Sequence, residues 1–300
     1  MTFYSQIELN KRKSAFFLAL FLIIVIALGW LFSVAFNSPA ILYIAVAVSL
    51  IQALVSYYSG DKIALSISGA TEIQKKDNPR LWNAVENLSI TAGIPMPRVY
   101  IMLDEPVPNA FATGRDPKHS SVAVTRGLLD SLSDSELTAV LAHEMSHIKN
   151  YDIRLMMIVV VLVGIIAILS NIFLRSRIFG FGNRDDNNSG GGQMQAIMLV
   201  IAIVAAILAP IAGTLIQLSI SRKREFLADS SGVSLTRYPE GLASALEKIS
   251  KYNQPMKHAS GATAHLYIAN PLGKKQSYLS KIFATHPPIA ERIAILRKMA

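Results

Sequence analysis

Two histidines and a glutamate between them are the residues of this chain best suited to chemistry. His143, Glu144 and His147 lie in the stretch LTAVLAHEMSHIKNYD, residues 137–152. On an α-helix this spacing brings both imidazoles to one face, about one turn apart, where they can bind one Zn²⁺ ion. The carboxylate of Glu144 can then reach an attacking water without being a ligand itself. The spacing therefore predicts a metal-dependent hydrolase with Glu144 as its general base.

The residues around this motif predict the helix that it needs. Ser133 and Glu136 have the S-x-x-E spacing of a capping box, which satisfies the first backbone N–H groups of a helix. Leu137, Val140 and Met145 then repeat at helical spacing, and no Gly or Pro interrupts the run. Two surface histidines that flank a glutamate by chance would need neither the cap nor the apolar face, so the pattern favours a metal site.

A second acidic pair supplies a candidate for the third ligand. The chain contains no Cys, so a zinc site must be completed by His or a carboxylate. Glu225 and Asp229 are four residues apart and share one face of a predicted helix. A solvated acidic face is the alternative interpretation. Beside two histidines that lack a third ligand, we expect Glu225 to bind the metal and Asp229 to orient a ligand histidine.

The composition places this motif in a membrane protein. The chain has 300 residues, a mean hydropathy of +0.39 and 52% hydrophobic against 16% charged residues, which is too apolar for an ordinary soluble domain. The net charge is +9, but no stacking motif for nucleic acid accompanies it. We attribute the charge to a positive-inside bias and to attraction toward anionic lipid heads. The expected partner is the bilayer and not nucleic acid, and the oligomeric state stays open.

Four apolar runs predict four transmembrane helices in two hairpins. They are Ser14–Phe36, Ala40–Tyr58, Ile153–Leu174 and Gln193–Leu218. Basic residues precede the first run and follow the last, so the positive-inside rule places the intervening soluble blocks in the cytoplasm. The Gly- and Asn-rich segment 175–192 is interpreted as an outer loop. Its arginines leave open whether the second hairpin crosses the bilayer completely.

These runs divide the chain into five parts. They are a cytoplasmic tail (1–13), a transmembrane hairpin (14–58), a first cytoplasmic part with the metal helix (59–152), a second hairpin (153–218) and a second cytoplasmic part with the acidic pair (219–300). The fold class is α+β and mainly α.

Short β-rich runs predict a small sheet beside the metal helix. They cover residues 99–103, 109–113 and 120–125, with a turn at 114–119, and a helix over 78–92 precedes them. An edge strand of this sheet could hold an extended peptide by backbone pairing. Residues 62–73 are interpreted as a mixed segment that leaves the membrane, 239–252 as an amphipathic helix and 254–278 as a loop. His119, His258 and His265 are expected at the surface.

Four motifs together carry a wider resemblance. They are His143-Glu144-x-x-His147, Glu225-x-x-x-Asp229, Asn109-Ala110-Phe111 and His286-Pro287-Pro288. In their order and chemistry, nearly the whole chain resembles the HtpX family, membrane-integrated zinc metalloproteases of bacteria and archaea. The resemblance implies a gluzincin-like domain that faces the cytoplasm at the cytoplasmic membrane. It also implies a role in membrane-protein quality control and the stress response.

The same resemblance assigns roles to single residues. It implies that His143, His147 and Glu225 bind one zinc ion per chain and that Glu144 is the base. His286 would then lie near the substrate carbonyl, where we expect it to donate to the oxyanion. By the same resemblance, Asn109, Ala110 and Phe111 lie on the strand that pairs with substrate. Arg292 either pairs with Asp229 or binds the substrate backbone, and the sequence does not choose.

The expected substrates are membrane proteins or unfolded polypeptides, because the site is tethered near the inner bilayer surface, and self-cleavage is expected.

Two other classes of function compete with a protease. A membrane scaffold with a structural metal would normally close its site with four protein ligands, and only three candidates are well placed. An ion transporter would need ionisable residues inside the apolar runs, and 14–36, 40–58 and 193–218 contain no Asp, Glu, Lys or Arg.

Overall fold

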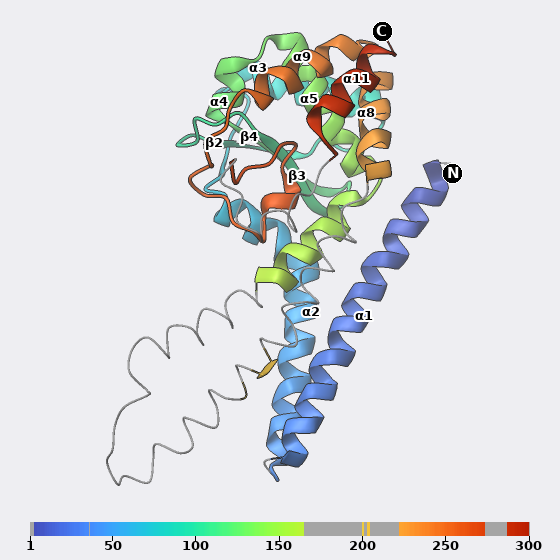
Figure 1. Ribbon diagram of the computed structural model, residues 1–300, viewed down its shortest axis with the longest axis vertical. Coiled ribbons are helices and arrows are strands. Elements are labelled where there is room, and N and C mark those ends of the chain that lie inside the picture. The colour runs from blue at the N-terminus through green and yellow to red at the C-terminus, as the bar shows by residue number, and fades with distance from the viewer. Residues whose placement is uncertain are drawn as a thin grey trace.

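Two long helices extend from one side of a domain that holds the sheet and the shorter helices (Figure 1). The computed structural model describes residues 3–35, 37–164, 200, 203–204, 222–273 and 287–299. The described elements are α1 (Phe3–Ala35), α2 (Pro39–Ile67), β1 (Thr71–Glu72), α3 (Pro79–Ala92), β2 (Arg98–Met102), β3 (Ala110–Asp116), β4 (His119–Thr125), α4 (Arg126–Ser131), α5 (Asp134–Lys149), α8 (Arg222–Thr236), α9 (Pro239–Ser250), η1 (Ala264–Leu266) and α11 (Ile289–Arg297).

The two long helices form the first predicted hairpin. The stretches Ile7–Val34 and Pro39–Ile67 are long and apolar enough to cross a membrane, with mean hydropathies of 2.9 and 2.1. Many of their large apolar side chains are exposed, among them Trp30, Ile44 and Leu54, as expected of helices that contact lipid. Most of the second predicted hairpin and the whole loop 175–192 lie outside the described residues. The described part therefore contains two candidate spans and does not test the four that we predicted.

The first part of the third apolar run packs on this hairpin. Residues 152–164 are helical and mostly buried. Leu155, Ile158 and Leu162 form a cluster with Phe17 and Phe21 of α1. This helix does not continue α5 directly, because α5 ends at Lys149 and the chain turns at Asn150 and Tyr151.

The second long helix extends beyond its predicted end. The apolar run stops at Tyr58, but α2 continues to Ile67, so the first half of the mixed segment 62–73 is helical. Ala64 and Leu65 are buried against Tyr100 and Phe111 of the sheet. The end of an apolar run indicates where contact with lipid ends. The helix itself continues beyond that point, because its next residues pack on the domain.

The sheet is mixed, with strand order β1-β2-β4-β3. β2 pairs with β4 in parallel, while β1–β2 and β3–β4 pair antiparallel. The strands β3 and β4 extend further than predicted, so that His119 opens β4 and the turn shortens to Pro117 and Lys118. β3 lies at one edge of this sheet, and α5 packs across the face (Figure 1).

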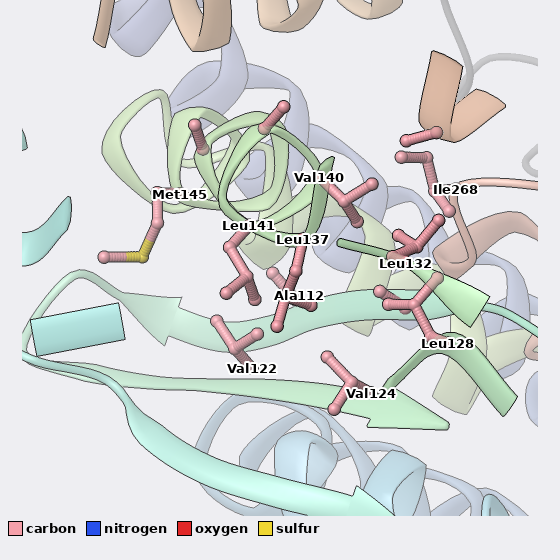
Figure 2. Packing of buried hydrophobic residues seen from close by; sticks show 14 of the residues in the cluster. Ala112, Val122, Val124, Leu128, Leu132, Leu137, Val140, Leu141, Met145 and Ile268 are labelled. Carbon is pink, nitrogen blue, oxygen red and sulfur yellow. The ribbon is translucent and has the colours of Figure 1, made fainter. Parts of the chain in front are cut away.

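The metal helix is fixed by its cap and by its apolar face. Ser133 and Glu136 form both hydrogen bonds of the predicted capping box. Figure 2 shows Leu137 and Leu141 pointing from α5 toward Ala112 and Val122 of the sheet. All four side chains are buried. Truncating such a leucine typically costs about 2–5 kcal/mol of stability, so this face anchors the helix strongly.

Part of the segment interpreted as a loop belongs to the core. Residues 263–269 are buried, although 264–266 form only one turn of 3-10 helix. The prediction that His265 lies at the surface is wrong, since its ring is fully buried and its Nε2 lies 3.1 Å from the carbonyl oxygen of Met156. The run of apolar residues around His265, ATAHLYIA, is the reason. His258 and His119 are exposed, as predicted.

Candidate metal centre

Two helices bring the three candidate ligands together. His143 and His147 project from α5, and Glu225 projects from the first turn of α8. One ligand atom from each lies within 4.8 Å of the others, and the two Nε2 atoms are 3.2 Å apart. The Glu225 carboxylate is 3.9 Å from Nε2 of His143 and 3.6 Å from Nε2 of His147. All three side chains are buried. The three ligands predicted from the sequence therefore lie close enough together to bind one metal ion.

A carboxylate holds the first imidazole from behind. Nδ1 of His143 lies 2.9 Å from Oδ1 of Asp229, one helical turn along α8 from Glu225. Arg292 of α11 donates to both oxygens of Asp229, at 2.9 and 2.6 Å, and its Nη1 lies 3.7 Å from Glu225. The structure thus selects the pairing of Arg292 with Asp229. Burial would raise the pKa of Asp229, but Arg292 and His143 hold it below its usual value.

A different carboxylate holds the second imidazole. Nδ1 of His147 lies 2.9 Å from Oδ2 of Asp152. Asp152 follows the break after α5, where Tyr151 adopts a left-handed φ of 60° and directs the chain back toward the site. Asp152 in turn accepts a 2.7 Å bond from the amide of Asn10 on α1.

Burial lowers the pKa of His147, but Asp152 and Glu225 outweigh it and raise the pKa to about 9. Burial lowers the pKa of His143 below its usual value despite Asp229.

Glu144 lies between the imidazoles and the edge of the sheet. It is buried, and its carboxylate accepts a hydrogen bond from the backbone N–H of Ala112 in β3. Burial, reinforced by the negative charge of Glu225, raises the pKa of Glu144 to about 7 against the opposing effects of His147 and Arg292. A carboxyl group with a pKa near neutrality is suited to accept and return a proton at physiological pH.

A glycine lets the second helix approach the first. A Cβ on Gly232 of α8 would lie 3.0 Å from the backbone N and 3.2 Å from the Cα of His143. Both of these atoms belong to helix backbone, which moves less readily than a side chain. Gly232 therefore allows the approach of α8 that carries Glu225 and Asp229 to the histidines.

The edge strand is partly paired within the chain itself. The N–H of Ile268 donates to the carbonyl of Ala110 at 3.0 Å, and Phe111 forms a β-bridge with Tyr267. The side chain of Asn109 is buried and exchanges hydrogen bonds with the backbone of Ala269. Asn109, Ala110 and Phe111 thus lie beside the site, and their contact with substrate stays a prediction.

Helical periodicity predicts the ligands and the base of this centre but not Asp152. Position i+5 from a helical histidine normally faces away from it. The signal available was its place just after the motif, in HIKNYD, but no Gly or Pro marks the break. His286 lies outside the described residues, and its role stays a prediction. Among described residues, α11 begins at Ile289 after Pro288.

The donors fit a small divalent cation. Each histidine uses Nδ1 to bond a carboxylate, which leaves its Nε2 directed at the other ligands. Carboxylate–histidine pairs of this kind fix the ring and raise its basicity in metal sites. Two imidazole nitrogens and one carboxylate form the ligand set of metal-dependent peptidases, which keep a further position open. With Glu144 beside the ligands, the arrangement defines a metallopeptidase centre.

Comparison with known proteins agrees with this class. Residues 75–300 match the model of peptidase family M48, and the chain belongs to this family. The Protease HtpX homolog of Tropheryma whipplei (strain Twist) is 46% identical over 297 residues, which cover 99% of this chain and 98% of that protein. The Protease HtpX homolog of Lactobacillus helveticus (strain DPC 4571) is 48% identical over 303 residues and covers 99% of each chain. The predicted resemblance to the HtpX family is confirmed.

Among solved structures, the crystal structure of S. mikatae Ste24p aligns with 97% of this chain and 67% of that chain, at 18% identity and a TM-score of 0.48. The family and the relatives make the chain a metal-dependent protease. The apolar helices α1 and α2 associate it with a membrane.

Proposed function

We propose that the chain is a zinc endopeptidase of the cytoplasmic membrane that hydrolyses peptide bonds in misfolded or damaged membrane proteins. The observation that carries the proposal is the convergence of His143, His147 and Glu225 beside the buried base Glu144, at the edge of a sheet. Zinc fits the nitrogen-rich ligand set, since carboxylates alone would favour magnesium or calcium. When bound, the ion would supply Lewis acidity to the scissile carbonyl and to the attacking water.

The chain's own residues would carry the proton transfers. Glu144 accepts a proton from the attacking water and returns it to the leaving amine, for which a pKa of about 7 is well placed. Asp152 and Asp229 keep the two imidazoles in the orientation that directs Nε2 at the ion. Arg292 balances the negative charge of Asp229 and Glu225. His286 is proposed to donate to the oxyanion.

The substrate would bind as an added strand. The N–H of Thr125 donates to the carbonyl of Asn109. The backbone N–H and C=O groups of residues 109, 111 and 113 therefore point toward β4, and those of residues 110, 112 and 114 point away from the sheet. The carbonyl of Ala110 is already paired with Ile268 and the N–H of Ala112 with Glu144, so we propose that an extended peptide pairs with β3 from the carbonyl of Ala112 onward. There it would pass Glu144, whose carboxylate meets Ala112.

The proposed location and substrates rest on the tether to α1 and α2. Basic residues lie at the domain end of the hairpin and not in its outer turn, which favours a cytoplasmic active site in a multi-pass bacterial or archaeal protein. A site held close to the inner bilayer surface would reach membrane proteins and unfolded segments first. Such a protease would be expected in quality control during stress, and it would also reach its own chain.

The first experiment is cleavage of an unfolded model protein by the detergent-purified chain, with and without a chelator. We expect cutting that the chelator stops and added zinc restores. Glu144→Gln should keep stoichiometric zinc but lose nearly all activity and any self-cleavage. Glu291→Gln, an exposed glutamate outside the centre, is the control. Zinc binding without cleavage by either protein, in detergent and in lipid, would instead favour a scaffold.

A further inference from the structure

A basic cavity lies where α2 meets the β3–β4 hairpin, and the proposed proteolysis does not use it. Its volume is about 380 Å³. Four basic side chains line it: Lys62 of α2, Arg98 of β2, Arg115 of β3 and Lys118 of the hairpin turn. Asp61 is the single carboxylate in the lining, and Tyr58 forms part of the wall.

The positive charge of this cavity is not neutralised within the described part of the chain. Asp61 is engaged by Arg98 at 2.8 Å. Lys62 and Lys118 have no carboxylate within 4.0 Å among the described residues. Arg115 lies 3.7 Å from Asp116, which offsets part of its charge, so Lys62 and Lys118 carry the excess positive charge of the lining. An anion is therefore the ligand that this lining would attract.

The cavity begins where the apolar part of α2 ends. The part of α2 from Pro39 to Tyr58 is about 30 Å long at 1.5 Å per residue, which matches the hydrocarbon thickness of a bilayer. The cavity begins at Tyr58, where this length ends. Tyrosines are enriched at that boundary, because their rings are apolar and their hydroxyl groups are wet.

Aromatic and basic side chains hold the wall of the cavity in place. The guanidinium of Arg115 lies 5.1 Å from the ring of Tyr58, and that of Arg154 lies 5.7 Å from the ring of Tyr57. Arg154 also donates to the backbone carbonyl of Arg115 at 2.6 Å. The helix 152–164 thereby ties the β3–β4 hairpin to the end of α2. The basic groups are held before any ligand arrives.

We propose that this cavity binds the phosphate headgroup of an anionic phospholipid from the leaflet on the side of the active site. Its charge selects phosphate, and its depth beside lipid-exposed α2 selects a lipid over a dissolved phosphate. Lys62 and Lys118 contact the phosphate, and Arg98 and Arg115 surround it. Occupancy holds the β3–β4 hairpin at the headgroup level, next to the strand edge that leads to Glu144.

The test measures lipid binding by the full chain in neutral detergent. Dioleoylphosphatidylglycerol is titrated against dioleoylphosphatidylcholine, and bound lipid is counted by native mass spectrometry beside the melting temperature. We expect a retained phosphatidylglycerol and a higher Tm for the unaltered chain. Lys62→Gln with Lys118→Gln should weaken retention by roughly tenfold or more, the scale for removing two basic groups from an anionic surface.

The control removes the same charge elsewhere. Lys76→Gln with Lys257→Gln, both exposed and outside the cavity lining, should retain the lipid as the unaltered chain does. Equal loss in both double variants would overturn the site, since net charge would then explain it. So would equal retention in both. If the double variant fails to fold in phosphatidylcholine, Lys118→Gln alone in the exposed turn replaces it.

A further arm separates the two sources of phosphate. Inorganic phosphate and glycerol 1-phosphate are added at matched concentrations in place of the lipid. A Tm rise that appears only with phosphatidylglycerol supports the proposal. An equal rise with inorganic phosphate, lost in the Lys62 and Lys118 variant, would overturn the lipid assignment and identify a site for a soluble phosphate.

Discussion

At the scale of single residues, the two ligand imidazoles are held by different carboxylates, and this difference can be measured. Asp152 holds only His147, and Asp229 holds only His143. Removing such a partner typically lowers metal affinity 10–100-fold. We therefore expect Asp152→Ala to weaken zinc binding by about that factor, as determined by competition with a chromogenic chelator. Asp104→Ala, an exposed aspartate, should bind zinc normally. An unchanged affinity in Asp152→Ala would mean that packing alone orients His147.

The same pair predicts how metal binding depends on pH. Burial lowers the pKa of both imidazoles, but Asp152 raises that of His147 to about 9, whereas that of His143 stays below its usual value. Above the pKa of Glu144, which is about 7, a cation must therefore displace one proton, from His147. Zinc affinity should rise about tenfold per pH unit between pH 8 and 8.5, because one proton leaves per ion bound there. Isothermal titration in buffers of different ionisation enthalpy counts the protons, and two protons per zinc would contradict this assignment.

The residues of the centre were predictable to different degrees for a physical reason. The relative positions of His143, Glu144 and His147 depend only on helical periodicity. The capping box, a local signal, is enough to predict that helix. Glu225 followed from the missing third ligand. The position of Asp152 depends on the left-handed conformation of Tyr151, and no Gly or Pro in the sequence predicts that conformation. The pairing of Arg292 with Asp229 joins residues 63 positions apart, and no local pattern encodes such a distance.

At the scale of elements, the centre depends on how closely α8 approaches α5. Gly→Ala in a helix normally adds up to about 1 kcal/mol of stability. At Gly232 the added Cβ would press on the backbone of His143 at 3.0 Å, and overpacking typically costs about 1–3 kcal/mol. We expect Gly232→Ala to lose stability and to bind zinc more weakly, since α8 carries Glu225 outward. Ser234→Ala on the exposed face of the same helix is the control. Differential scanning calorimetry with and without zinc measures both effects, and a more stable variant with normal zinc affinity would refute the argument.

Element boundaries show what a periodic pattern can encode. The helix 79–92 was predicted closely, because Asn78 caps it and Gly93 takes the left-handed conformation that ends it. The burial of residues 263–269 was not predicted, because those residues are fixed by Ala110 and Asn109, which are distant in sequence. Local signals specify where a helix stops, while the route of an irregular segment depends on the partners it meets.

At the scale of the whole molecule, the first membrane helix reaches the metal centre. Asn10 of α1 donates to Asp152 at 2.7 Å and to the carbonyl of Asn150 at 2.9 Å, and Asp152 holds His147. The chain from α1 to the ligand is buried throughout. The hairpin is therefore part of the support of the centre as well as a membrane anchor, and movement of α1 relative to the domain should alter zinc affinity.

This coupling predicts that Asn10→Ala weakens zinc binding, by less than Asp152→Ala does, because Asp152 keeps its bond to His147. Ser14→Ala, a buried change one turn along α1 that does not touch Asp152, should leave the affinity unchanged. The decisive measurement is a double-mutant cycle. If Asn10 acts through Asp152, Asn10→Ala has no further effect on zinc affinity in the Asp152→Ala protein. Additive losses would show instead that α1 supports the centre by packing alone.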